Sequence, residues 1–148
     1  MMRLWKCLKE MMINMNYLID THIAIFAMAN QNELAKKFTN ELANLNNRVF
    51  VSIASIWEVV IKSNKHPDKI PINEKQFIRY CEEMEFEFLP IKIKHITNIR
   101  NLKLKNKNII HKDPFDRLLI SQSQSENLIF CTRDTVLLNY DVTNIKIV

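Results

Sequence analysis

The chain has 148 residues and a formal net charge of +5, with 47% hydrophobic and 25% charged residues. This length and composition are typical of one soluble globular domain. The sequence contains no glycine, which excludes the glycine-rich phosphate-binding loops of dinucleotide- and nucleoside-triphosphate-binding proteins. Cys7, Cys81 and Cys131 are widely spaced and form no C-x-x-C pair, so we expect neither a disulfide framework nor a cysteine zinc site.

The first fourteen residues stand apart from the pattern that follows them. Lys6, Lys9 and Glu10 interrupt their apolar residues, so this stretch lacks the continuous apolar core of a signal peptide. We expect residues 1–14 to be an extension, either an added helix or the product of an upstream start codon. The longest uncharged apolar stretch falls far short of the ~20 residues that cross a bilayer. The sequence therefore predicts a cytoplasmic protein that does not span a membrane, with one domain over residues 15–148.

The first half of this domain alternates between strand and helix patterns. Residues 16–19 (NYLI) read as a buried strand, and 21–29 as a short helix. Residues 32–45 have leucine and phenylalanine at helical spacing, which predicts an amphipathic helix. Residues 48–52 (RVFVS) are rich in β-branched and aromatic side chains and predict a second strand, and 53–65 a helix that is apolar on nearly all sides.

The middle of the chain continues the alternation. Two prolines break residues 66–72 into a loop, and 74–84 follow as a helix. Residues 86–91 (FEFLPI) predict a short strand, and 94–102 a helix. A polar connection then runs to Pro114.

The last third begins with a helix that Pro114 opens. Proline is favoured at the first helical position, so we expect this helix over residues 114–127. Residues 128–132 (LIFCT) predict a buried strand, 133–140 a short helix and 145–148 a final strand.

Apolar strands that alternate with helices are typical of a parallel sheet with both faces covered. The sequence therefore predicts an α/β fold: a single-domain, three-layer sandwich whose central, mainly parallel, twisted sheet has about five strands. Such sheets bind ligands beyond the carboxyl ends of their strands. Because glycine is absent, we expect asparagines in residues 44–48, 63–65 and 105–108 to take the turn positions with positive φ.

Four acidic residues fall near the predicted ends of strands or beginnings of helices. Asp20 directly follows the first strand, and Glu58 lies in the helix after the second. Asp116 lies in the first turn of the helix that Pro114 opens, and Asp134 stands two residues after strand 128–132. Because the carboxyl ends of parallel strands meet at one edge of a sheet, all four acids can converge there.

Each of these acids also has a simpler structural interpretation. Asp20 and Asp134 could cap the helices that follow them, and Asp113 could cap the next helix in a capping box with Asp116. Capping does not explain Glu58, which lies inside an apolar helix, where an unpaired carboxylate costs several kcal/mol. An ion pair with Lys62, four residues on, is its alternative, worth only ~0.3–0.5 kcal/mol if exposed.

Clustered carboxylates repel one another, so their pKa values rise unless a cation neutralises them. Mg²⁺ prefers oxygen ligands, and Mn²⁺ suits the same kind of site. The four histidines show no metal-ligand spacing, so the acids alone are the expected ligands. Without a nucleotide-binding loop, this set of acids predicts metal-assisted phosphodiester chemistry.

Four blocks resemble a PIN domain, and specifically a VapC-type toxin ribonuclease of a bacterial toxin–antitoxin pair. They are YLIDTH (17–22), VSIASIWEVVIK (51–62), HKDPFDRLLISQS (111–123) and IFCTRD (129–134). They occur in the family's order, and the resemblance extends over residues 16–148.

The resemblance places the family's metal-binding acids on Asp20, Glu58, Asp116 and Asp134, with Asp20 and Asp116 as the central ligands. Thr132 and Ser55 match polar positions that would support these acids. The resemblance implies a Mg²⁺- or Mn²⁺-dependent endoribonuclease that leaves 5′-phosphate and 3′-hydroxyl ends. It also implies a homodimer and a cognate antitoxin whose extended tail covers the acidic pocket. Residues 63–72 lack the glycine usual in the family, which bears on the choice of RNA.

Three other functions remain open at this stage. A HAD-like phosphatase would need a second aspartate two residues after Asp20, where the chain has His22. A receiver-type phospho-acceptor would need paired acids after the first strand and a late lysine. A non-catalytic PIN-like module that binds RNA or protein would be expected to lack at least one of the four acids.

Overall fold

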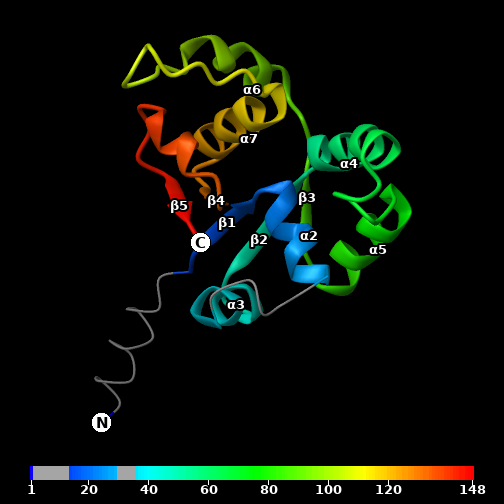
Figure 1. The fold of residues 1–148 in the computed structure, drawn as a ribbon. Coiled ribbons are helices and arrows are strands. Elements are labelled where there is room, and N and C mark those ends of the chain that lie inside the picture. Colours follow the sequence, from blue (N-terminus) through cyan, green and yellow to red (C-terminus); the bar gives the residue numbers. More distant parts are fainter. Residues whose placement is uncertain (2–13, 30–35) are drawn as a thin grey trace.

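The computed structural model describes Met1, residues 14–29 and residues 36–148. These residues form a five-stranded sheet in the order β3-β2-β1-β4-β5, in which every neighbouring pair is parallel (Figure 1). The strands are β1 (Asn16–Ile19), β2 (Arg48–Ser52), β3 (Glu87–Leu89), β4 (Ile129–Thr132) and β5 (Ile145–Ile147). The predicted parallel α/β sheet is confirmed. Apart from Met1 and Asn14, the predicted extension over residues 1–14 lies outside the described residues.

The helices follow the predicted order, with two differences in type. They are α2 (Thr21–Ala29), α3 (Lys36–Ala43), α4 (Ile53–Lys65), α5 (Glu74–Glu83), α6 (Ile93–Thr97) and α7 (Pro114–Ser125). The helix expected over 94–102 is α6 followed by the 3₁₀ helix η2 (Asn98–Asn101), and the one expected over 133–140 is the 3₁₀ helix η3 (Thr135–Asn139). The beginning of the helix expected over 32–45 lies outside the described residues. No helix in the described part of the chain is long and apolar enough to cross a bilayer.

Two hydrophobic cores lie on opposite faces of the sheet, because successive strand side chains alternate between faces. In β1, Tyr17 and Ile19 belong to the core under α2, α3, α4 and α5, whereas Leu18 belongs to the core under α7 and η3. Helix α6 packs against α7 on this second side (Figure 1). The three-layer arrangement is therefore confirmed, with helices covering both faces.

The residues with positive φ differ from those predicted. Positive φ occurs at Glu85 (57°) and Asn127 (54°), just after the ends of α5 and α7, and not in the three asparagine-containing stretches. Asn44 and Asn106 instead accept hydrogen bonds from backbone amides two residues ahead. The prediction of positive φ there was wrong because asparagine also stabilises turns through its side chain, with ordinary φ values.

The helix beginnings position the acids at the carboxyl edge of the sheet. Ser52 ends β2 and caps α4 by accepting a hydrogen bond from the Ala54 amide, which fixes where Glu58 lies. Asp113 caps α7 by accepting from the amides of Phe115 and Asp116. The interpretation of Asp113 as a cap is thus confirmed, and the cap places Asp116 in the first turn of α7.

Candidate metal-binding site

Asp20 lies at the end of β1 and is 5% exposed. Its Oδ2 accepts a 2.8 Å hydrogen bond from Thr132 Oγ1, at the end of β4. Burial raises the pKa of Asp20, while the Thr132 hydrogen bond and the nearby His22 oppose that rise. Thr132 Oγ1 also accepts the Asp134 amide at 3.1 Å. Thr132 therefore holds the segments that carry Asp20 and Asp134 against each other.

Glu58 lies on the buried face of α4 and is 2% exposed. Its Oε2 accepts a 2.6 Å hydrogen bond from Thr21 Oγ1, which also lies 2.8 Å from Ser55 Oγ. Its Oε1 forms an ion pair with Lys62 Nζ, and the same ammonium lies 3.8 Å from Asp113 Oδ2. The Lys62 partner weighed from the sequence is present. Lys62 is half-buried and Glu58 is buried, so Glu58 has a charge partner within the chain.

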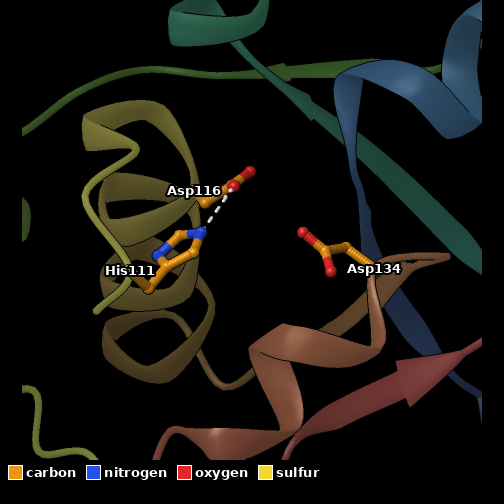
Figure 2. A group of neighbouring side chains, drawn as sticks. All are labelled: His111, Asp116 and Asp134. Atoms are coloured by element: carbon orange, nitrogen blue, oxygen red, sulfur yellow. Dashed lines mark hydrogen bonds and ion pairs between the residues drawn. The ribbon is translucent and has the colours of Figure 1, made fainter. Parts of the chain in front are cut away.

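Asp116 and Asp134 approach each other from two different elements, together with His111 (Figure 2). His111 lies in the connection before α7, and its Nε2 is 3.1 Å from Asp116 Oδ2. Asp134 follows β4 and is exposed. One ligand atom from each of the three residues lies within 4.8 Å of the other two. In Figure 2 the two carboxylates point into the same space, as ligands of a shared cation would.

Electrostatics link all of the predicted acids to Asp116. Its pKa is raised to about 8, first by burial and then by the charges of Asp20, Asp113, Glu58 and Asp134. Because charge repulsion weakens with distance, the acids whose charges raise this pKa lie near Asp116. At neutral pH, and with no cation bound, the Asp116 carboxyl would therefore keep its proton. The carboxylate oxygens of Asp20, Asp116 and Asp134 are a donor set that fits Mg²⁺ or Mn²⁺.

His111 is the site residue that sequence reasoning missed. Its Nδ1 lies 2.9 Å from the hydroxyl of Tyr140, which is buried, and the two rings meet edge to face. The imidazole is therefore held at both nitrogens, by the Tyr140 hydroxyl at Nδ1 and by the Asp116 carboxylate at Nε2. The motif H-K-D-P-F-D contained this residue, but no rule of ligand spacing links a loop histidine to an aspartate five residues later.

One of these acids both caps a helix and faces the candidate site. Asp134 Oδ1 accepts a 2.9 Å hydrogen bond from the Val136 amide, so Asp134 caps η3 as well as facing Asp116. Asp116 directs its carboxylate toward His111, and no capping-box hydrogen bond from it to Asp113 occurs in the described residues. Helix capping therefore explains Asp113 and part of the position of Asp134, but not that of Asp116.

The family model of the PIN domain matches residues 17–142, most of the chain, and the chain belongs to the PIN domain family. A search of curated protein sequences finds no match.

Three solved structures show the same fold at 19% identity each. VapBC2 from Rickettsia felis, bound to a DNA fragment from its promoter, has a TM-score of 0.68 and covers 90% of this chain and 98% of its own. A toxin–antitoxin complex from Klebsiella pneumoniae has a TM-score of 0.58, with coverages of 88% and 95%. VapBC-1 from nontypeable Haemophilus influenzae has a TM-score of 0.56, with coverages of 81% and 87%.

Proposed function

We propose that this protein is a metal-dependent endoribonuclease that acts as the toxin of a bacterial toxin–antitoxin pair. The observation that carries the proposal is the meeting of Asp116, Asp134 and His111, with one ligand atom from each within 4.8 Å of the other two. The charges of Asp20, Glu58 and Asp134 also help to raise the pKa of Asp116. Such a cluster gains most from a divalent cation. The PIN family match and the toxin–antitoxin complexes among the similar folds support the same function.

In this proposal Asp20, Asp116 and Asp134 hold Mg²⁺ or Mn²⁺, with Glu58 completing the acidic pocket. A bound divalent ion would lower the pKa of a water molecule and stabilise negative charge on the phosphate. Thr132 keeps the Asp20 carboxylate oriented through its 2.8 Å hydrogen bond. His111 similarly orients Asp116 from the other side, at 3.1 Å.

Glu58 depends on a second set of polar groups. Thr21 and Lys62 fix its two carboxylate oxygens, and Ser55 contacts Thr21. Under the proposal these side chains hold the Glu58 carboxylate toward the other acids in the absence of substrate.

A protein partner is part of the proposal. Trp57 on α4 is 59% exposed and packs edge-on against Phe115, with ring centroids 5.1 Å apart. Lys62, which pairs with Glu58, lies 6.0 Å from the centre of the Phe115 ring, so this aromatic pair lies beside the acid cluster. An antitoxin could cover both, with a basic side chain neutralising the acids. We also propose that the protein acts in the cytoplasm as a homodimer.

The test is RNA cleavage by the purified protein, together with growth of bacteria that express it. We expect cleavage of single-stranded RNA with Mg²⁺ or Mn²⁺, and growth arrest, both abolished by Asp20→Asn and by Asp116→Asn. Glu82→Gln, which removes an exposed acid on α5, is the matched control and should keep both activities.

Three other results would point elsewhere. Cleavage that continues undiminished in EDTA would contradict the metal mechanism. RNA binding without cleavage would indicate a non-catalytic PIN-like module. A phosphate trapped on Asp20 would indicate a phosphatase.

A further inference from the structure

The connection that leads to His111 is rich in basic residues. Residues 100–112 contain five basic residues and no acidic one. All five are exposed, and none has an ion-pair partner among the residues that the structure describes. We call these five residues and Arg117 the basic edge: Arg100, Lys103, Lys105, Lys107, Lys112 and Arg117.

Two of these residues line one groove. Arg100, from η2, and Arg117, from α7, border a groove of about 720 Å³. Its other lining residues are Ile96, Thr97 and Ile99. Neither guanidinium forms an ion pair within the described part of the chain, so both are available to an anionic ligand.

One of the groove residues, Arg117, lies next to the acid cluster. Arg117 follows Asp116 in α7, and its charge opposes the rise that burial causes in the pKa of Tyr140. The Tyr140 hydroxyl lies 2.9 Å from His111, which in turn contacts Asp116. Arg117 therefore lies one side chain beyond the residues that orient Asp116.

The chemistry of the groove favours a phosphate backbone. Guanidinium groups bind phosphate through paired hydrogen bonds, and a row of exposed lysines adds attraction along a polyanion. The acid cluster by itself repels RNA, so a nuclease of this kind needs positive charge close to it. Ile96 and Ile99 give the groove an apolar lining that ribose and bases can contact, whereas an isolated small anion would gain nothing from it.

We propose that the basic edge binds the backbone phosphates of a single-stranded RNA substrate on one side of the cleaved bond, with Arg100 and Arg117 holding a phosphate in their groove. This inference rests on the proposed nuclease function and adds to it the path of the substrate. It assigns the strand to the side of the acid cluster formed by α6, η2 and α7.

The test measures RNA affinity in an Asp116→Asn background, which prevents cleavage, with Mg²⁺ present and over a series of salt concentrations. The probe is a fluorescent single-stranded RNA oligonucleotide followed by anisotropy. Arg100→Gln/Arg117→Gln should weaken binding roughly 10-fold or more and lower the salt dependence by about 0.7 per lost phosphate contact. Arg100→Lys/Arg117→Lys should keep most of the salt dependence but lose part of the affinity, because lysine lacks the paired donors.

The matched control removes two charges from the other face of the sheet. Lys75→Gln/Arg79→Gln lies on exposed positions of α5, where Arg79 pairs with Glu83. If this control and the arginine variant have equal affinity and equal salt dependence, the inference is wrong. An arginine variant that binds RNA normally but no longer binds an acidic protein partner would also overturn it.

Cleavage by the protein with Asp116 intact separates this inference from the proposed function. We expect Arg100→Gln/Arg117→Gln to raise KM with little change in kcat. A parent that cleaves RNA while this variant keeps its KM would leave the nuclease proposal intact and overturn the inference. A parent that binds RNA through these arginines without cleaving it would overturn the nuclease proposal and support only the binding of RNA phosphates by the basic edge.

Discussion

Thr132 Oγ1 donates a 2.8 Å hydrogen bond to Asp20 Oδ2, which joins the ends of two adjacent parallel strands across 112 positions of sequence. The same oxygen accepts the Asp134 amide. A single hydroxyl thus fixes the position of two acids of the candidate site. Because Asp20 is buried, the hydrogen bond also favours its ionised form.

Thr132→Val keeps the shape of the threonine but removes this hydroxyl. We expect metal affinity to fall about 10- to 100-fold, since Asp20 loses its orienting donor and becomes harder to ionise. Thr132→Ser should restore most of the affinity, because serine keeps the hydroxyl. Calorimetric titration with Mn²⁺ measures the effect, and equal affinity of the valine variant and the parent would contradict this role of Thr132.

His111 is expected to act through Asp116. His111→Ala removes the 3.1 Å contact and should weaken Mn²⁺ binding and RNA cleavage together, about 10- to 100-fold. His111→Gln can still place an N–H donor near Asp116 and should recover part of both. Tyr140→Phe, which removes only the hydroxyl next to Nδ1, should show a smaller loss of the same kind.

Equal losses in the alanine and glutamine variants, each folded as judged by circular dichroism, would refute this orienting role. They would indicate instead that the imidazole itself is needed, as a direct ligand would be.

Asp116 should make the metal-free protein less stable as pH rises. Its folded-state pKa, about 8, lies above the ordinary value of 3.8, so the folded state holds this proton more tightly than the unfolded state. The contribution of Asp116 to the free energy of unfolding is therefore fully present below about pH 4 and is lost as pH rises through about 8. Asp116→Asn cannot ionise and escapes this loss.

Thermal unfolding in EDTA at about pH 5 and about pH 8.5 tests this expectation. We expect Asp116→Asn to exceed the parent by roughly 1–3 kcal/mol at the higher pH, and by much less at the lower pH. Added Mn²⁺ should raise the melting temperature of the parent and not that of the variant. A variant less stable than the parent at the higher pH would show that Asp116 is stabilised, not strained, in the metal-free protein.

Glu58 and Lys62 form the ion pair that decides whether Glu58 serves the fold or the chemistry. Lys62→Met leaves a 2% exposed carboxylate without its cation and should cost roughly 2–4 kcal/mol. Glu58→Gln should cost less, and the double variant should recover much of the loss because no buried charge remains.

RNA cleavage by the same variants separates the two roles of Glu58. We expect Glu58→Gln to be folded and to lose cleavage, and the double variant to stay inactive despite its recovered stability. Full cleavage by Glu58→Gln would show that Glu58 only stabilises α4.

Sequence patterns predicted the positions of Asp20, Asp116 and Asp134 because local rules fix all three. Each lies at the end of a strand or the beginning of a helix, and parallel strands bring those ends to one edge. The order of strands and helices followed from the same alternation of apolar runs.

Local sequence patterns could not predict which side chains of α4 are buried, because tertiary packing decides this. Helix 53–65 reads as apolar on nearly all sides, yet Trp57 and Val60 are exposed and Glu58 is buried. The burial that makes the Lys62 partner important to Glu58 is likewise set by the neighbouring helices.

The sequence did not predict His111 as a site residue, for a different reason. It lies in a polar connection without periodicity, and its position depends on Tyr140, 29 residues away. An isolated bridge between Leu104 and Tyr140 ties that connection to the segment after η3. Only long-range contacts place this imidazole beside Asp116.

The most direct measurement is cleavage of an RNA in which sulfur replaces a non-bridging oxygen of the cleaved phosphate, tested as each diastereomer. Mg²⁺ binds sulfur poorly and Mn²⁺ tolerates it better. We expect one diastereomer to be cleaved slowly in Mg²⁺ and restored by Mn²⁺, with no restoration in Asp116→Asn. Cleavage of the unmodified RNA at the same rate in EDTA would contradict the claim that these acids act through a bound cation.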